Sequence, residues 1–430
     1  MDSVLLFGCT VLLFGLVALA SISMLASIVA LALAGGITVL TCFGLEKTGT
    51  GLIFLAMVFA PMNSVGPSAA VSFVTFADLF FFLGFSCLLP TMLLRRSPAP
   101  PLLYILGAII LVAVGSVTSI GATHPGISLN LMSRLVVTAL GLPLAFMFWR
   151  PGWKLTGYLA GGYVLGVIIS AGYGVVTGTH SSGLETRYIG LTEQPNELGL
   201  TGLLGAALVP YIVKVMPPTH RWFWWGAGAI NVGAIWISGS RAALLVLVMM
   251  AFIYPIIEKS AKATAWLFAG ITIGLALSSK LLADKSGALG RLLGAGSASA
   301  SDEQRSGLIH EGLTLFQAHP LFGSGFETAL IYHVIYLEVA VCVGIFGLVG
   351  FLFLLGSGVL PLFTAPRPLH RLAYPALAYA LVGCLTPLLW DRYIWSAIGL
   401  SYLVATTMTP AERAEIESTY VEPTKERVNS

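Results

Sequence analysis

Residues 331–358 read IYHVIYLEVAVCVGIFGLVGFLFLLGSG, an almost wholly apolar run. A helix needs about 20 mostly apolar residues to cross the hydrocarbon core of a bilayer. His333 and Glu338 are the acidic or basic side chains of this run, and both lie close to its start. The stretch therefore predicts a transmembrane helix that begins at the boundary with water.

The rest of the chain has the same apolar character. Its 430 residues are 57% hydrophobic and 10% charged, whereas a soluble domain carries roughly 25% charged residues. Further candidate spans occur at 4–20, 24–44, 50–64, 70–94, 102–122, 130–149, 153–178, 197–216, 221–238, 241–258, 264–281, 371–389 and 391–408. Together they predict an all-α, polytopic transmembrane helical bundle of 12–14 spans with one large external loop.

Polar stretches divide the chain into five expected segments. These are N-terminal transmembrane helices at 1–178, central transmembrane helices with an arginine-bearing loop at 179–281, a large loop at 282–330, C-terminal transmembrane helices at 331–409, and a tail at 410–430. The first run follows Asp2 and no basic residue. Because a secretory signal needs a basic start, we expect a retained helix. The five cysteines lie in apolar runs, which argues against a disulfide framework or a zinc site.

The basic residues predict the orientation, because cytoplasmic loops are enriched in Lys and Arg. With the N-terminus inside, 14 of the 22 basic residues fall on the cytoplasmic side, which favours an even number of spans and two cytoplasmic termini. The aromatic cluster at 222–225, next to Arg221, is typical of an interfacial belt. The net charge of +3 gives no indication of a nucleic-acid partner.

The other basic residues fall on the outer side. They are Arg134, Arg187, Arg241, Lys280, Lys285, Arg291, Arg305 and Arg392. Arginine suits bidentate phosphate binding, because its planar fork matches two oxygens and stays charged. The group therefore suggests a phosphate-bearing lipid with an external head group. The alternative is snorkelling or local pairing with nearby acidic residues.

Two outer segments contain possible anion-binding residues. Arg187 lies in a polar loop that ends at Pro195, and Asn196 is a plausible N-cap of the helix that follows. Ser240 can cap a helix that begins at Arg241. A helix start is a poor place for a cation unless an anion joins it, so an anion site is favoured there.

The large loop has its own helical signal. From Arg305, the apolar positions 308, 309, 312, 313, 315 and 316 fit an amphipathic helix on the membrane surface, with the acidic pair 302–303 near its start. The small-residue stretch 294–301 before it is expected to be a linker. Residues 323–325, Gly-Ser-Gly, predict a turn with exposed N–H groups and lack the pattern of a hydrolase nucleophile elbow.

His333 is the leading candidate for chemistry, because a histidine at the water boundary can take a proton near neutral pH. A merely solvated side chain is the alternative. The histidines lack metal-ligand spacing and no Asp-x-Asp pair occurs, which disfavours a metal-dependent glycosyltransferase that uses nucleotide sugars. We expect no metal and no other cofactor. Asp78 is either a proton-relay residue or a buried partner of a polar neighbour.

Several phrases, taken in order, resemble the O-antigen ligase and polymerase superfamily. They are TEQPNELG at 192–199, SGSRAALL at 238–245, Arg305, HPLFGSG at 319–325, HVIYLE at 333–338 and GIFGL at 344–348. The resemblance covers roughly 187–350. It differs from the usual His-Asn pair, because Val334 follows His333.

The resemblance implies a bacterial inner-membrane enzyme that acts at the periplasmic face, where the large loop would lie. It would transfer glycan from an undecaprenyl-diphosphate carrier to a hydroxyl of a glycan or lipid A-core acceptor. By matching motif position, Arg241 and Arg305 would bind the diphosphate and His333 would act on the acceptor hydroxyl. Arg187 and Arg291 match more loosely.

Three other interpretations stay open at the level of sequence. A polymerase that joins repeat units is expected to have nearly the same reaction centre as a ligase. A secondary transporter could use Asp78 or His333 for ion coupling, although no internal symmetry of inverted repeats is visible. A scaffold without catalysis would leave the external arginines unexplained.

Overall fold

The computed structural model describes residues 24–67, 74–95, 99–180, 187–276, 288–292, 298–329, 332–406 and 418. The expected span at 4–20 and nearly all of the tail lie outside these residues. The described part is helical and contains no strand, apart from an isolated antiparallel bridge between His180 and Tyr188. The expected all-α class is confirmed.

Eight described helices are long and apolar enough to cross a membrane, as a multi-pass membrane protein requires. They are the second part of α2 (Met24–Phe59), α3 (Phe76–Leu94), α4 (Leu102–Ile120), α5 (Pro125–Leu135) continued through η2 (Val136–Gly141) and α6 (Leu142–Trp149), α7 (Trp153–Thr177), α8 (Pro195–Val215), α10 (Arg241–Glu258), and α15 (Ile335–Val359) continued through α16 (Pro361–Thr364). The full count of 12–14 spans and the orientation stay predictions.

Some helices differ from the expected spans. The runs at 24–44 and 50–64 form one element, α2, which changes direction at Gly44, where φ is 78°. The run at 371–389 contains η5 (Leu369–Ala373) and the short helix α17 (Tyr374–Val382), and it continues as irregular backbone toward α18 (Arg392–Ala405). Pro387 explains part of this, because a proline disfavours helical backbone at the residue before it.

The chain forms two compact units, residues 1–53 with 80–95, and residues 54–79 with 96–430. In the first unit, α2 packs closely on α3, since a Cβ at Gly49 would lie 2.7 Å from the Leu88 side chain. Glu46 and Arg95 form an exposed ion pair at 2.8 Å. The expected segment boundaries near 178, 281 and 330 all fall inside the second unit.

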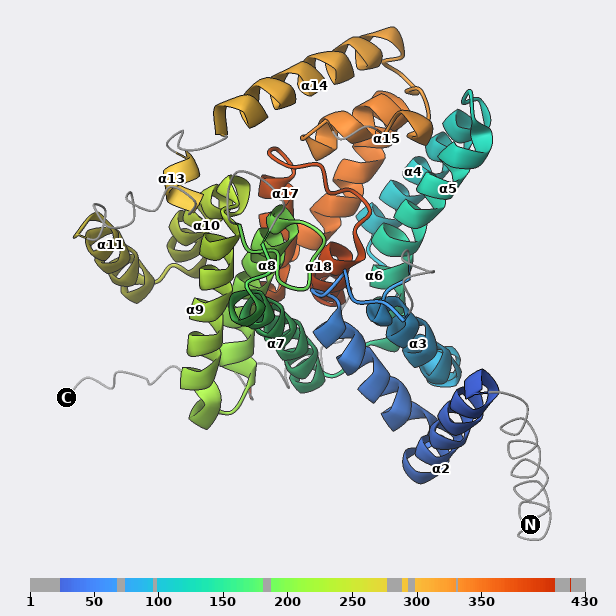
Figure 1. Ribbon diagram of the computed structural model, residues 1–430, viewed down its shortest axis with the longest axis vertical. Coiled ribbons are helices and arrows are strands. Elements are labelled where there is room, and N and C mark those ends of the chain that lie inside the picture. Colours follow the sequence, from blue (N-terminus) through green and yellow to red (C-terminus); the bar gives the residue numbers. More distant parts are fainter. Residues whose placement is uncertain are drawn as a thin grey trace. The chain divides into compact units, whose positions relative to one another are not determined.

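In the second unit, α8 is almost entirely buried and packs against α7, α9 (Arg221–Ser238), α10 and α17 (Figure 1). Glycines allow the close approach of α9. A Cβ at Gly202 would lie 2.7 Å from the Asn231 carbonyl, and Gly205 faces the Asn231 side chain. The Asn231 amide donates to the carbonyls of Val164 and Ala227, so it ties α9 to α7.

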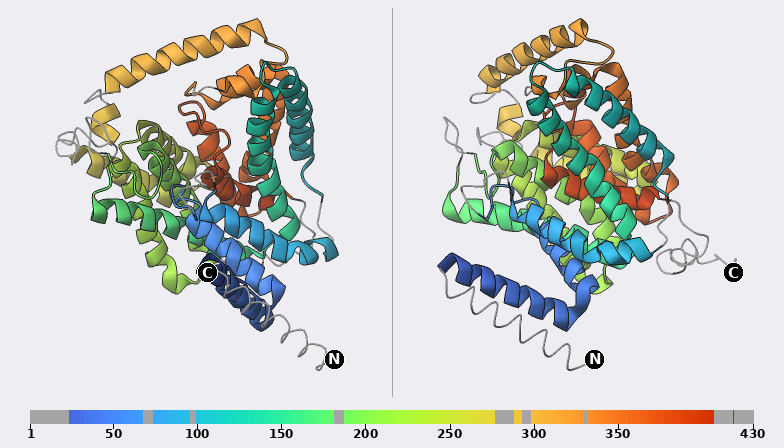
Figure 2. Two further views of the ribbon diagram at one scale, coloured as in Figure 1. Left: turned by 45° about the vertical axis from the view of Figure 1, so that its right-hand side comes forward. Right: turned by 90° about the vertical axis from the view of Figure 1, so that its right-hand side faces the viewer.

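The large loop is mostly helical where it is described. It contains α13 (Ala288–Leu292) and α14 (Ala298–Ala318), and α14 packs against α15 (Figure 2). The covered positions of α14 are 305, 308, 309, 312, 315 and 316, the spacing of one helix face. Leu313 was expected on this face but is 44% exposed. The helix also begins seven residues before Arg305, so 298–301 are helical and not a linker.

Candidate functional site

The site is built around the start of α10. Helix α9 ends at Ser238, Gly239 turns the chain with φ 63°, and Ser240 is the N-cap of α10. The Ser240 hydroxyl accepts from the N–H of Ala243 at 3.5 Å, so the predicted cap is confirmed. The first N–H groups of a helix carry partial positive charge and favour an anion.

Two of the predicted arginines, which lie in other segments of the chain, donate hydrogen bonds to the backbone of this turn. Nε of Arg187 donates to the Ser238 carbonyl at 2.8 Å, and Nη1 of Arg291 donates to the Gly239 carbonyl at 2.9 Å. Because both carbonyls are engaged, the turn is fixed and α10 begins at a defined place. Arg187 therefore has a structural task that the sequence did not predict.

Asn196 is the second partner of Arg187. The N-cap of α8 is Gln194, with Pro195 in the first helical turn and Glu197 completing a capping box, so the prediction of Asn196 as the cap is wrong. Proline is preferred at the first helical position, so Pro195 begins the helix and the cap lies at Gln194, two residues before Asn196. The freed Asn196 amide oxygen accepts from Nη2 of Arg187 at 2.8 Å.

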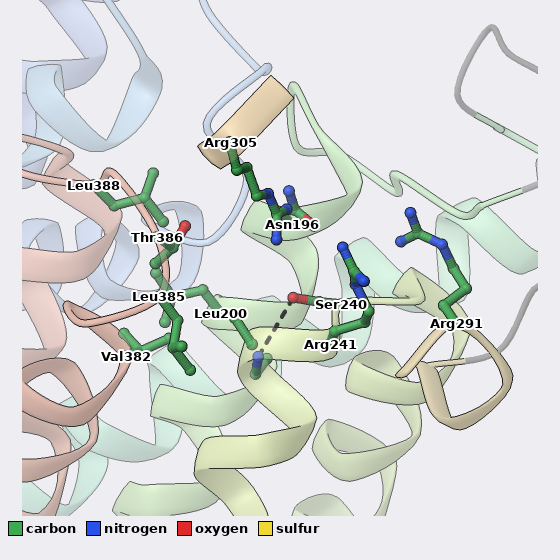
Figure 3. A pocket seen from close by; sticks show the side chains of 12 residues that line it. Asn196, Leu200, Ser240, Arg241, Arg291, Arg305, Val382, Leu385, Thr386 and Leu388 are labelled. Atoms are coloured by element: carbon green, nitrogen blue, oxygen red, sulfur yellow. Dashed lines mark hydrogen bonds between the residues drawn. The ribbon is translucent and has the colours of Figure 1, made fainter. Parts of the chain in front are cut away.

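A pocket opens in front of the α10 turn (Figure 3). Arg241, Arg291 and Arg305 lie along one side, from α10, α13 and α14. Asn196 and Ser240 lie between them. Leucines form much of the remaining wall. The structure thus brings together three of the four arginines expected to bind a ligand, and Arg187 stands behind them.

The opposite wall comes from the last residue of α17 and the irregular segment that follows it. Its lining residues are Val382, Leu385, Thr386 and Leu388. Two buried aromatic side chains hold the backbone of this segment: the Tyr379 hydroxyl donates to the Leu388 carbonyl, and the Trp395 indole donates to the Leu389 carbonyl, both at 2.8 Å.

Sequence reasoning missed this apolar wall, because it lies within a run expected to be a transmembrane span. The step from Thr386 to Pro387 was the available signal, since a proline interrupts a helix. A cationic wall facing an apolar wall is suited to an anion that is attached to a hydrocarbon chain.

The pocket gathers three positively charged side chains. Arg291 is only 6% exposed, and Arg241 and Arg305 are half-buried. Guanidinium groups that share one pocket repel one another, and the repulsion is stronger where water is excluded. A multivalent anion between them would relieve this repulsion, and the N–H groups at the start of α10 would also attract such an anion.

His333 lies two residues before α15 and is half-buried. Its backbone φ is +60°, which is uncommon for a residue with a side chain. Burial, and then the positive charge of Arg305, hold the pKa of His333 below its ordinary value. His333 is therefore an electrostatic neighbour of Arg305, and at neutral pH its imidazole is uncharged and can accept a proton.

Among the described residues, His333 and the other basic residues of the predicted outer side do not line this pocket. Arg134 is exposed, and Lys280 and Lys285 lie outside the described residues. Arg392 pairs with Asp78 at 2.6 Å. Asp78 also accepts from the N–H and the hydroxyl of Thr75. The structure therefore favours the partner interpretation of Asp78 over a proton relay.

Comparison with known protein families and with curated proteins found no match for this chain.

Proposed function

We propose that this chain transfers a glycan from an undecaprenyl-diphosphate carrier to an acceptor hydroxyl at the periplasmic face of a bacterial inner membrane. The observation that carries the proposal is the pocket that has Arg241, Arg291 and Arg305 on one side and an apolar wall on the other. A polyprenyl diphosphate has matching chemistry, because its charged diphosphate is bonded directly to a hydrocarbon chain.

The arginines suit a diphosphate better than a single carboxylate. Each guanidinium can engage two oxygens at once and remains charged at any physiological pH. Three of them, together with the start of α10, match the several oxygens of a diphosphate. Leu385 and Leu388 would contact the first hydrocarbon units of the carrier.

The reaction that follows is a displacement at the anomeric carbon. The acceptor oxygen forms a bond to that carbon while the bond from the carbon to the phosphate oxygen breaks. The diphosphate leaves with the bonding electron pair, and the arginines stabilise its growing negative charge. His333 accepts the proton of the acceptor hydroxyl as the new bond forms.

Arg305 would contribute in two ways. It lines the pocket, and its charge adds to burial, the larger cause, in lowering the pKa of His333. A lower pKa keeps the imidazole neutral, and only the neutral form can accept a proton. The same guanidinium would thus bind the leaving group and keep the base in its working state.

A ligase and a repeat-unit polymerase share this reaction, and the acceptor distinguishes them. Analysis of glycans from a deletion strain separates the two. Loss of a polymerase leaves single capped repeats, whereas loss of a ligase leaves long chains that remain on the carrier lipid.

The interruption of α15 bears on the transporter alternative. Transporters often bind ions at the free backbone groups of a broken membrane helix. In α15 the helix is interrupted at Gly344, but N–H and carbonyl groups on both sides bond to residues 320–325 of the same chain. Their engagement argues against an ion site at this break.

The direct test is purified protein in lipid nanodiscs supplied with undecaprenyl diphosphate that carries a labelled glycan. We expect the label to move to an added acceptor. The His333→Ala variant should lose at least about 100-fold in rate, and Arg134→Ala, which changes an exposed arginine of the same predicted face, should retain activity. A folded wild-type protein that consumes no lipid-diphosphate glycan contradicts the proposal.

A further inference from the structure

Helix α15 is interrupted, and the hydrogen-bond partners of the interrupted backbone come from another segment of the chain. At Gly344 the backbone has φ 63° and ψ −168°, which is far from helical. Such a break leaves carbonyls before it and N–H groups after it without their helical partners. In an apolar environment unsatisfied backbone groups are strongly destabilising, so partners are required.

Residues 320–325 supply these partners. The N–H groups of Ser324 and Gly325 donate to the carbonyls of Val341 and Cys342 at 2.8 and 2.9 Å. After the break, the N–H of Ile345 donates to the Pro320 carbonyl at 2.9 Å. A fourth bond joins Phe346 to Leu321 at 3.4 Å. We name residues 320–325 and their bonds to α15 the clasp.

Glycine is required on both sides of the clasp. Gly323 and Gly344 have φ of +75° and +63°, a region that side chains disfavour. A Cβ at Gly323 would lie 2.5 Å from the Cys342 carbonyl carbon, and one at Gly344 would overlap the backbone of Leu321. A side chain at either position therefore forces the two backbones apart.

The two residues that follow the clasp are bonded to α5 and to the turn before it. The N–H of Phe326 donates to the Ser128 hydroxyl at 2.7 Å. The carboxylate of Glu327 accepts from the N–H groups of Thr123 and His124 at 2.6 and 2.5 Å. The segment after α14 is thus held between α15 on one side and the turn from α4 to α5 on the other.

Helix α14 makes a second contact at Gly312, which lies along the chain between Arg305 and the clasp. A Cβ at Gly312 of α14 would lie 2.9 Å from the Tyr332 ring and 3.0 Å from Leu337. Tyr332 is fully buried, and its hydroxyl donates to the Thr328 carbonyl at 2.8 Å. Because His333 follows Tyr332 directly, α14 rests on both sides of His333.

We propose that Gly312, Gly323 and Gly344 are positioning residues that hold Arg305 on α14 at a set place relative to His333 at the start of α15. The clasp fixes the end of α14, and the Gly312 contact fixes its middle. This inference rests on the proposed function, in which Arg305 binds the leaving group and His333 accepts the proton.

Hydrogen exchange tests the clasp without any assay of activity. In purified wild-type protein, we expect the N–H groups of Gly323, Ser324 and Gly325 to exchange slowly although they lie outside a helix. In Gly344→Ala the same groups should exchange at least about tenfold faster. Gly356→Ala is the matched control, because it lies on α15 with open space around it and should leave exchange unchanged.

Kinetics test the positioning role. Gly312→Ala is the milder variant, since its nearest neighbour is a side chain, and Gly307→Ala on the same helix meets nothing within 4 Å. We expect Gly312→Ala to lower kcat about tenfold or more and to raise the Kd for inorganic diphosphate no more than Arg305→Lys does, because Arg241 and Arg291 stay in place and Arg305 is shifted but not removed. The acid limb of its pH profile should also move upward, since Arg305 then acts less on His333.

The two hypotheses fail in different ways. If the N–H groups of the clasp exchange slowly in wild-type protein but the protein transfers no glycan, the proposed function is wrong. The hydrogen bonds of the clasp are then still supported. If Gly312→Ala and Gly344→Ala keep the wild-type kcat and pH profile while exchange in the clasp is accelerated, the positioning role is wrong. A wild-type clasp that exchanges as fast as free peptide overturns the inference from the start.

Discussion

Arg187 and Asn196 are joined by a hydrogen bond of 2.8 Å between Nη2 and Oδ1, while Nε of the same guanidinium donates to the carbonyl of Ser238. One side chain thus connects the loop before α8, the start of α8 and the end of α9. Since Asn196 lines the pocket and Ser238 lies two residues before the α10 N-cap, this link sets the relation between two parts of the site.

Removing the guanidinium of Arg187 should disorder the arginine pocket, although all three arginines that line the pocket remain. We expect Arg187→Ala to weaken binding of the lipid diphosphate by about 10- to 100-fold, because the Ser238 carbonyl and the Asn196 amide both lose a charged donor. Asn196→Ala should cost less, since the bond from Arg187 to Ser238 remains. Titration of the labelled donor in nanodiscs measures both, and equal affinities in all three proteins contradict this role.

The bidentate geometry of the guanidinium groups that line the pocket should contribute to donor binding in addition to their charge. Arg241→Lys and Arg305→Lys keep a positive charge but lose bidentate geometry. We expect each to raise the Kd for the donor by about tenfold, equivalent to 1.4 kcal/mol. Arg134→Lys, at an exposed position, serves as the control and should bind like the wild type. Full affinity in both lysine variants would show that only net charge is used.

The pH dependence of transfer should reflect the lowered pKa of His333. Its ordinary pKa is 6.5, and burial and Arg305 lower it. The neutral base therefore persists as the pH falls below 6.5, and activity should fall only as the pH passes through the lowered pKa. Arg305→Gln removes one cause of the shift, so the acid limb should move to higher pH, whereas Arg305→Lys should leave it nearly in place.

Chemical modification of His333 follows its protonation without any enzymatic turnover and complements the pH profile of transfer. Diethyl pyrocarbonate modifies neutral imidazole, and mass spectrometry of the peptide that contains His333 reports its extent at each pH. An identical titration of His333 in the wild type and in Arg305→Gln would show that Arg305 does not act on it.

A buried ionic cluster far from the pocket should govern stability. Glu258, at the end of α10, accepts from His370 at 3.0 Å, from Arg371 through Nε and Nη2, and from the Tyr374 hydroxyl at 3.2 Å. Its side chain is 4% exposed. We expect Glu258→Gln to destabilise the protein by about 3–5 kcal/mol, because the buried Arg371 loses its counter-charge.

The exposed pair of Glu46 and Arg95 provides the comparison for this prediction. Both of its side chains are more than half exposed, and such pairs contribute at most about 1 kcal/mol. Glu46→Gln should therefore shift thermal unfolding in detergent far less than Glu258→Gln. Equal shifts would mean that the buried cluster is not a major source of stability.

The membrane helices could be predicted because the requirement is local. About 20 consecutive apolar residues satisfy it wherever they occur, and the described part of the chain contains eight such helices. The cap of α10 at Ser240 is equally local, as is the amphipathic face of α14. A prediction was wrong where two local signals competed. Asn196 was expected to be the N-cap of α8, but Pro195 takes the first helical position and the cap is Gln194.

The grouping of the arginines could be suspected from the sequence but not located. Arg241, Arg291 and Arg305 all fall on the predicted outer side, yet so do Arg134 and Arg392. The structure brings the first three into one pocket, leaves Arg134 exposed and pairs Arg392 with Asp78. No spacing along the chain distinguishes these outcomes, because they depend on which helices pack together.

By itself, the sequence determined that this is a multi-helix membrane protein, which polar groups lie near the helix ends, and where helices can begin. Only the tertiary structure decided that Leu385 and Leu388 face the arginines and that residues 320–325 bridge the break at Gly344. The physical reason is that hydropathy separates lipid from water but does not distinguish one apolar neighbour from another. In a chain that is apolar almost throughout, close packing at glycines and the need to satisfy backbone groups make that choice.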